Sequence, residues 1–294
     1  MKFILGGLGN FSNSWKLAER AATIADDLGF YGLVLPDHYM WDRNEMPDRN
    51  STLDCWIALT FLAAKTRKLM LGTLVTPIPL RPPGILAKMV ATLDIVSSGR
   101  AVLGVGAGWS RTEFEGYSEW NDSKTRVDKT EEGVQLIRKL WQDEVVDFQG
   151  RFYKAKAAVL EPKPVQKPYP PLLFGGFSPR MLRLAGRYGD LCFIPPWIQI
   201  PFDRAKSKAE TEAKRAGRPG ELSFGAGSPT SLGGKFDVRA LEKDIQASAN
   251  KGCEFYITPF PQDDYVEKMK EFARDILPSY NDPTRIVTKA PSSH

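Results

Sequence analysis

His38 is the residue whose chemistry is easiest to recognise in this chain, and it follows Asp37 at the end of a short apolar run. Histidine titrates near neutral pH, so it suits proton donation or acceptance in a reaction at a carbonyl or an imine. The other histidine is the terminal His294, which excludes a metal site built from several histidines. His38 could instead be a structural histidine, and Asp37 could either orient its ring or cap the next turn.

Glycines dominate two further segments that follow apolar runs. The first, Gly104-Val105-Gly106-Ala107-Gly108, lacks the spacing of a dinucleotide-binding fingerprint. Its glycines would let a flat ring approach the backbone closely, or they would only form a tight turn. Trp109 follows directly. With Trp41 and Trp197 it could form the walls of a site for a planar cofactor, although ordinary packing explains any single tryptophan.

The second glycine segment, Gly175-Gly176-Phe177-Ser178-Pro179, has the features of a helix start. Ser178 is a good N-cap, and proline is favoured at the first helical position. Free backbone N–H groups at such a start suit a phosphate, and Arg180 and Arg183 would add positive charge. The alternative is a well-capped helix without a ligand.

Eight short apolar runs alternate with amphipathic helical patterns. The runs do not alternate apolar with polar residues, so both faces of each strand should be covered, as in a parallel sheet. The predicted strands cover residues 3–5, 32–35, 69–75, 101–105, 172–174, 190–194, 222–225 and 254–257. The predicted helices run from Ser14, which can cap the first one, to Gly29, which can close it, and from Pro82 to Gly99. Others are predicted over about 52–65, 125–141, 179–188, 203–216, 237–250 and 263–277. This alternation predicts an α/β protein, a (β/α)₈ TIM barrel, with a doubly wound sheet as the competing architecture.

Two stretches do not fit a minimal barrel. Residues 109–124 are interpreted as a polar loop that carries aromatic side chains. Residues 144–171 are predicted to be an insertion before the fifth strand, a hairpin followed by an extended proline-rich segment. We therefore expect one barrel over residues 1–278 and a loose C-terminal tail over residues 279–294. In such a barrel the site lies at the carboxyl ends of the strands, where the segments described above fall.

Composition and charge describe an ordinary globular protein. The 294 residues are 42% hydrophobic and 26% charged, and a net charge of +5 favours an anionic ligand. Basic and acidic residues alternate along the helical patterns, so no nucleic-acid surface is expected. Cys55, Cys192 and Cys253 form no metal-binding or redox pattern and are expected to be reduced and buried. Neither a signal peptide nor a membrane span is recognisable, which predicts a soluble cytoplasmic protein.

Several of these segments together resemble the luciferase-like superfamily, and within it the oxidoreductases that depend on the deazaflavin coenzyme F420. The most specific segment is SGRAVLGVGAGW at residues 98–109. The others are residues 29–38, 71–73, 86–88, 91–94, 175–176 and 184–190. The chain is similar to methylenetetrahydromethanopterin reductase-like and F420-dependent dehydrogenase proteins over residues 1 to about 195, and the likeness weakens beyond them.

The resemblance implies a flavin-like ring stacked at the strand ends and a non-proline cis peptide near Leu74–Val75. It places the cofactor phosphate on the amides of residues 176–178, and it gives His38 the position facing the reacting carbon. In our leading hypothesis Asp37 orients His38. A homodimer is usual for the family. The residues assigned to cofactor binding are Thr73, Leu74, Val75, Gly106, Ala107, Gly108, Trp109, Gly175, Gly176, Phe177 and Ser178.

The function implied is hydride transfer between F420 and a small carbonyl, imine or activated alkene. Alcohol- and sugar-oxidising relatives carry a glutamate where this chain has Trp109, and the reductase-like relatives carry an acid where residues 6–9 supply none. Glu113 and Glu115 in the following loop could substitute. An FMN-dependent monooxygenase shares almost all of these residues, and a non-catalytic ligand-binding barrel is a further alternative. The chain shows no NADPH-binding fingerprint, and its positive charge suits the acidic tail of F420; both favour the deazaflavin.

Overall fold

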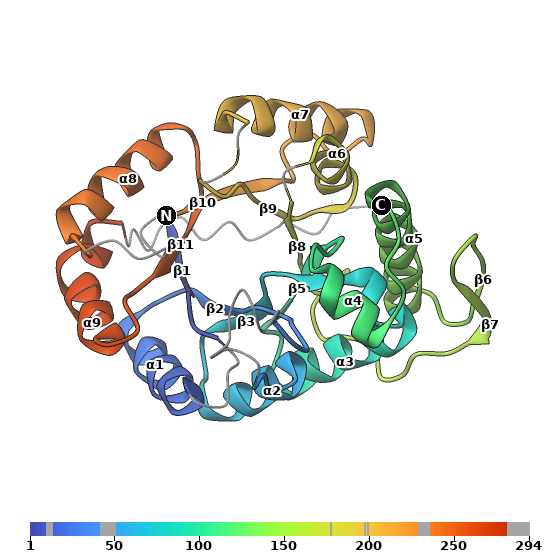
Figure 1. Cartoon of the computed structure of the whole chain (residues 1–294), viewed down its shortest axis with the longest axis horizontal. Helices are drawn as coiled ribbons and strands as arrows, with labels where there is room; N and C mark the ends of the chain where they lie inside the picture. The colour runs from blue at the N-terminus through green and yellow to red at the C-terminus, as the bar shows by residue number, and fades with distance from the viewer. Residues whose placement is uncertain are drawn as a thin grey trace.

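The structure is a closed ring of eight parallel strands surrounded by helices (Figure 1). The computed structural model describes residues 1–9, 14–41, 51–176, 178–196, 198, 200–228 and 236–280. Neighbouring strands follow the order β3-β2-β1-β11-β10-β9-β8-β5, and pairing of β3 with β5 closes the ring. The barrel strands are β1 (Lys2–Gly6), β2 (Gly32–Leu35), β3 (Met70–Thr73), β5 (Ala101–Gly106), β8 (Leu172–Gly175), β9 (Leu191–Phe193), β10 (Ser223–Gly227) and β11 (Phe255–Pro259).

A helix follows each barrel strand and packs on the outside of the ring (Figure 1). This closed alternation confirms the predicted (β/α)₈ barrel and excludes the doubly wound sheet, which would be open. These helices are α1 (Trp15–Leu28), α2 (Cys55–Lys65), α3 (Pro83–Val96), α5 (Ser123–Gln142), α6 (Pro179–Tyr188), α7 (Phe202–Arg215), α8 (Val238–Asn250) and α9 (Tyr265–Asp275).

Successive side chains of the strands build two separate cores. On β1, Phe3 and Leu5 pack against the helices, whereas Ile4 belongs to a second cluster inside the barrel. The inner cluster consists of Ile4, Val34, Val102, Leu173, Phe193, Phe255 and Ile257. Because these side chains fill the interior, a ligand has to bind at an end of the barrel and not inside it.

Two local predictions were wrong. Residues 109–124 are not all loop, because α4 (Arg111–Tyr117) forms inside them. Ser110 caps this helix, since its Oγ accepts a hydrogen bond from the Glu113 N–H at 3.4 Å. Ser14 precedes α1 as expected, but its hydroxyl makes no capping bond. Gly29 does end α1, with a left-handed φ of 89°.

Short elements lie between the main units. The strands β6 (Val146–Gln149) and β7 (Lys154–Ala158) pair antiparallel with each other and project beyond α5, which confirms the hairpin predicted within residues 144–171 (Figure 1). The strand β4 (Thr76–Pro77) pairs with β5, and η3 (Ile78–Leu80) and η5 (Leu277–Ser279) are single 3₁₀ turns. The predicted C-terminal tail lies outside the described residues from residue 281 onward.

The three cysteines are buried and free, as predicted. Burial raises the pKa of Cys192 to about 12 and that of Cys253 to about 11, so both remain thiols at neutral pH. Within the described ranges, no helix has the length and apolarity that crossing a bilayer would require.

Candidate active site at the barrel mouth

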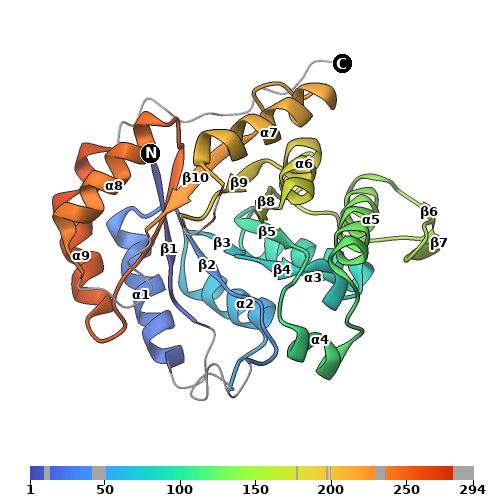
Figure 2. The ribbon, with the colours of Figure 1, turned by 45° about the horizontal axis from the view of Figure 1, so that its top comes forward.

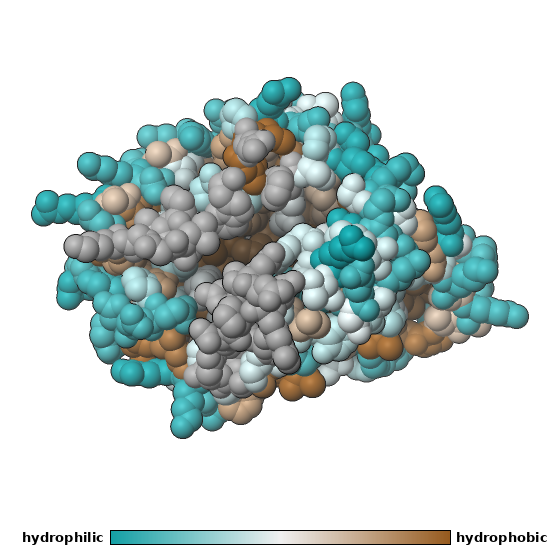
Figure 3. Space-filling model, in the orientation of Figure 1, coloured by the Kyte–Doolittle hydropathy of each residue, from teal (hydrophilic) through white to brown (hydrophobic). Residues whose placement is uncertain are grey.

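The candidate side chains lie together at the end of the barrel that the carboxyl ends of the strands form. His38 follows β2, the segment Leu74–Val75 follows β3, and Trp109 follows β5. Figure 2 shows α4 at the end of the barrel toward which β1 and β2 run. In the orientation of Figure 1 the surface is hollowed near its centre, and apolar side chains line the hollow (Figure 3).

His38 is held by Glu113, which comes from α4. His38 Nδ1 lies 3.0 Å from Glu113 Oε2, and the other carboxylate oxygen accepts the Tyr39 backbone N–H at 2.6 Å. The side chain of Glu113 is 1% exposed and that of His38 is 12% exposed. A carboxylate that accepts both bonds leaves the hydrogen on Nδ1, so Nε2 is the ring nitrogen available for proton exchange.

Two tryptophans flank the imidazole. The ring of Trp41 lies 4.2 Å from the His38 ring, centroid to centroid, and the ring of Trp109 lies 5.6 Å from it in an edge-on arrangement. The two indoles are 6.1 Å apart, so the three rings form one aromatic cluster. Trp109 is 59% exposed, which is unusual for so large an apolar side chain. It is therefore placed to contact a ligand that enters the barrel mouth.

Asp37 does not orient His38, which corrects the expectation from the sequence. Its carboxylate is paired with Arg81 through two hydrogen bonds, from Nε at 2.9 Å and from Nη2 at 2.7 Å. Thr76 Oγ1 and Trp56 Nε1 also donate to it, at 2.7 and 3.2 Å. Both carboxylate oxygens of Asp37 therefore take part in this buried network, which anchors the residue before His38.

Arg81 also connects that network to Asp54 and to the ring of Tyr39. Its Nη2 also donates to Asp54 Oδ2 at 2.9 Å, and its guanidinium lies over the Tyr39 ring, 4.6 Å from the centroid. Burial opposes the charge of Arg81, but the Asp37 carboxylate outweighs it and raises the pKa of the guanidinium. Burial raises the pKa of Tyr39 to about 12, so the phenol stays protonated. The Arg81 cation is thus paired with two carboxylates, those of Asp37 and Asp54.

The peptide bond between Leu74 and Val75 is cis, as the resemblance implied. A Cβ on Gly106 would lie 2.4 Å from a methyl carbon of Val75, and one on Gly175 would lie 2.6 Å from its other methyl. On Gly104 it would meet the Thr73 carbonyl oxygen at 1.9 Å. These glycines therefore make room for the Leu74–Val75 segment after β3, which we call the bulge. The approach of a flat ring to residues 104–108 stays a prediction.

Among the remaining candidate residues, the structure describes Gly108 and Ser178. Gly108 has a φ of +79° and packs closely on Phe114, so it turns the chain from β5 into α4. Ser178 caps α6 by accepting the Met181 N–H at 3.2 Å. Phe177 and Trp197 lie outside the described residues.

Arg180, expected to add charge to the start of α6, is instead paired with Asp128. Its guanidinium is therefore already neutralised by a carboxylate. Gly176 directly follows the last residue of β8, and Ala107 lies between β5 and Gly108.

Glu113 and Arg81 are the functional residues that sequence reasoning undervalued. Glu113 lies 75 positions from His38, and a contact of that separation leaves no local signature. The spacing Ser110-x-x-Glu113 is nevertheless a helix-start pattern, which could have placed the carboxylate on a helix. Arg81 follows a proline-flanked run and gave no signal of its own.

Known proteins are similar to this chain in family, sequence and fold. The family described as luciferase-like monooxygenase matches residues 4–273. An F420-dependent glucose-6-phosphate dehydrogenase from Microbacterium testaceum (strain StLB037) is 33% identical over 171 residues. The match covers 57% of this chain and 48% of that protein, so it spans about half the length of the relative.

Solved structures share the fold over nearly the whole chain. An F420-dependent secondary alcohol dehydrogenase in complex with an F420–acetone adduct superposes with a TM-score of 0.79 and 22% identity, covering 96% of this chain and 99% of that one. The monooxygenase RslO1 from Streptomyces bottropensis gives a TM-score of 0.80 at 22% identity, covering 95% and 100%. At these identities the likeness establishes the barrel architecture alone.

Proposed function

The chain belongs to the luciferase-like monooxygenase family, and we propose that within it the protein is an F420-dependent oxidoreductase. The observation that carries this proposal is the His38–Glu113 pair, which lies among Trp41 and Trp109 at the mouth of the barrel. The similarity to an F420-dependent dehydrogenase supports the choice of cofactor. The reaction proposed is hydride transfer to or from a carbonyl, an imine or an activated alkene.

The residues at the mouth fit a planar cofactor. Leu74 packs on the inner core and is only partly buried, so it offers an apolar floor next to the bulge. Trp41 and Trp109 supply aromatic surface beside His38, and such surfaces suit a flat ring. The start of α6, from Gly176 to Ser178, is the proposed position of the phosphate. When bound, F420 supplies a carbon that donates or accepts the hydride.

In this mechanism His38 exchanges the proton that accompanies the hydride, through Nε2. Glu113 holds the hydrogen on Nδ1 and stabilises the positive ring that forms when Nε2 takes up a proton. Because Glu113 is buried on a capped helix, the imidazole is fixed before substrate arrives. Asp37 and Arg81 act as positioning residues, since they hold the backbone that leads into His38.

Trp109 is proposed to shape the substrate pocket. It stands where sugar- and alcohol-oxidising relatives were expected to carry a glutamate, and it is the most exposed member of the aromatic cluster. The acidic partner of His38 lies instead on α4, beneath the imidazole. A substrate held against an indole is expected to present an apolar face, so replacing Trp109 by alanine should raise KM more than it lowers kcat.

An FMN-dependent monooxygenase is the second candidate, because the family includes such enzymes and a monooxygenase shares the fold. A barrel that binds a flavin without catalysis is the third. These three functions differ in what they require. The first needs F420 and turnover without oxygen, the second needs FMN and oxygen, and the third needs neither turnover nor oxygen.

We also propose that the protein works as a cytoplasmic homodimer. Two adjacent helices, α2 and α3, are apolar on nearly all sides, and Ile57, Phe61 and Ile85 are exposed on them. A helix that is apolar all round normally has a partner on each face. Sedimentation equilibrium tests this proposal, with a monomer mass at all concentrations as the contradicting result.

The proposed function is tested by turnover with reduced F420 under nitrogen. A panel of carbonyl compounds, imines and activated alkenes is added, and the absorbance of oxidised F420 is followed. Production of oxidised F420 that depends on both enzyme and substrate supports the proposal. Reaction only with FMN and oxygen would support the monooxygenase instead, and no turnover with either cofactor would favour the non-catalytic barrel.

A further inference from the structure

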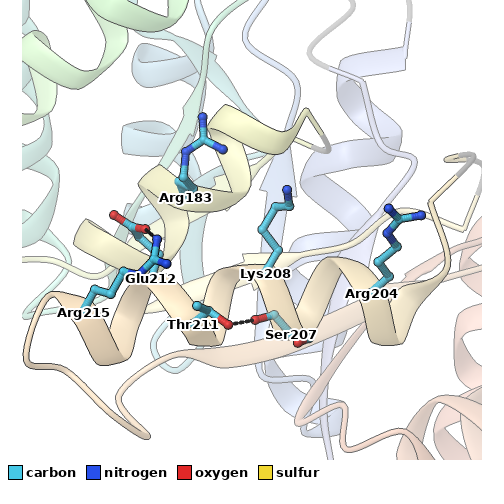
Figure 4. A pocket seen from close by; sticks show the side chains of 7 residues that line it. All are labelled: Arg183, Arg204, Ser207, Lys208, Thr211, Glu212 and Arg215. Carbon is cyan, nitrogen blue, oxygen red and sulfur yellow. Dashed lines mark hydrogen bonds and ion pairs between the residues drawn. The ribbon is translucent and has the colours of Figure 1, made fainter.

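A groove of about 400 Å³ is lined by side chains of α6 and α7, the helices that follow β8 and β9 (Figure 4). Four of its seven lining side chains are cations and one is a carboxylate. In Figure 4 the head groups of Arg183, Lys208 and Arg204 extend to the same side of the two helices. The lining residues are Arg183, Arg204, Ser207, Lys208, Thr211, Glu212 and Arg215.

The two helices that form the groove are fixed tightly against each other. A Cβ on Gly186 would lie 2.2 Å from the Ala209 carbonyl oxygen, so the backbones of α6 and α7 are in direct contact there. Arg187 adds a polar connection, because it donates to Glu212 at 2.7 Å and to Glu131 at 2.5 Å. The groove is therefore preformed, and a ligand would not have to order it.

Most of its positive charge is not neutralised. Across the ranges that the structure describes, Arg183, Arg204 and Lys208 form no ion pair. The one carboxylate, Glu212, is already paired with Arg187 and, at 3.6 Å, with Arg215. The hydrogen bond from Arg187 lowers the pKa of Glu212, and the charges of Arg215 and Arg183 add to that effect. Glu212 is thus ionised, but its negative charge is already balanced by Arg187 and Arg215. It therefore does little to neutralise the other cations of the groove.

The arrangement is unfavourable without an anion. Arg204 and Lys208 stand four residues apart on one face of α7, where like charges repel. From Arg204 to Arg215 the cations extend over roughly 16 Å of helix, at 1.5 Å per residue. A single phosphate would reach only part of this row. An extended ligand with several carboxylates would neutralise all of it.

We propose that this groove binds the acidic, glutamate-bearing tail of F420. The inference rests on the proposed function, because it places the tail relative to a cofactor at the barrel mouth. Helix α6 connects the two sites: its N-cap, Ser178, belongs to the proposed phosphate position, and Arg183 follows five residues, roughly 7.5 Å, farther along. The cations of α7 then continue the row along the outside of the barrel.

The test compares three ligands: the deazaflavin nucleoside without phosphate or tail, F420 with one glutamate, and F420 with a long glutamate tail. Dissociation constants are measured by ligand fluorescence at low and at high salt. For the unmodified protein, the long tail should tighten binding about tenfold relative to one glutamate, and high salt should remove most of that gain. The nucleoside should bind with the same affinity at both salt concentrations.

The variant Arg204→Gln/Lys208→Gln should reduce the gain from the long tail to less than about threefold without changing nucleoside binding. The matched control Lys154→Gln/Lys156→Gln removes the same charge from β7, which lies apart from α6 and α7 (Figures 1 and 2). It should keep the full gain. Thermal melts of both variants verify that they fold.

The possible results distinguish failure of the proposed tail site from failure of the proposed function. If every deazaflavin binds but affinity does not depend on the tail, or if both double variants lose the gain equally, the groove is not the tail site. If neither the nucleoside nor any form of F420 binds, the proposed function fails, and this inference fails with it.

Discussion

Replacing Arg81 by methionine should destabilise the protein strongly, because it removes the cation from a buried ion pair. The Asp37 side chain is 1% exposed and that of Arg81 is 8% exposed, and two hydrogen bonds of 2.7 and 2.9 Å join them. Methionine has a similar length but no charge. Asp37 would then keep only the donors from Thr76 and Trp56.

Breaking one partner of a buried pair costs about 3–5 kcal/mol, since a charge stays behind without compensation. The two remaining donors place Arg81→Met near the lower end of that range. In a chain of this size, 1 kcal/mol shifts the melting temperature by about 2–4 °C, so a fall of about 6–15 °C is expected. The double variant Asp37→Asn/Arg81→Met removes both charges and should recover part of the loss.

The assay is urea unfolding, with thermal melts as a second measure, on four proteins. Asp54→Asn is the matched control: Asp54 also bonds to Arg81, but its side chain is 29% exposed, and asparagine can still cap α2. That control should cost less than about 1 kcal/mol. If Arg81→Met costs no more than Asp54→Asn, or if the double variant is the least stable of the four, the network does not stabilise the site as argued.

Three further predictions follow from the same geometry. Glu113→Gln should lower kcat about 10²-fold and change the dissociation constant of the cofactor less than about threefold, as steady-state kinetics and titration would measure. Gly106→Ala should cost about 1–3 kcal/mol in urea unfolding, because its Cβ would lie 2.4 Å from the bulge, whereas Gly84→Ala, with 3.9 Å of space, should be neutral or stabilising. Burial would raise the pKa of Asp26, but three backbone N–H groups lower it below 3.8. Stability from Asp26 is therefore present above about pH 4 and lost as the pH falls through the lowered value, and Asp26→Asn should flatten this part of the unfolding profile.

The barrel could be predicted because its signals are local. Each strand is a short apolar run, and each helix follows within a few residues, so the alternation can be read without knowledge of contacts. The helix predicted over 179–188 agrees with α6, since Ser178 and Pro179 mark its start. Residues 109–124 were misread because α4 is only seven residues long and carries few apolar side chains.

The position of His38 could be predicted, but its partner could not. Its place after the second strand follows from the barrel pattern alone. The choice between Asp37 and Glu113 depends on which carboxylate points at the ring, and that is decided by packing over 75 residues of chain. A neighbour in sequence was the natural candidate, yet Arg81 holds it in another direction.

The glycines after the strands are a second case in which the sequence indicates a contact but not the contacting group. Gly106 and Gly175 signal that something approaches the backbone closely, and this much is contained in the sequence. Whether that neighbour is a ligand or another part of the chain depends on the tertiary structure. Here Val75 from the bulge fills the space beside both glycines.

The central claim, that the barrel mouth binds F420, is tested most directly by titrating the purified protein with F420 and, separately, with FMN. Binding is followed by quenching of tryptophan fluorescence, because Trp41 and Trp109 lie at the proposed cofactor site. The account predicts saturable quenching by F420 at concentrations at which FMN has little effect. Preferential binding of FMN would contradict the choice of cofactor, and binding of neither would contradict the catalytic site itself.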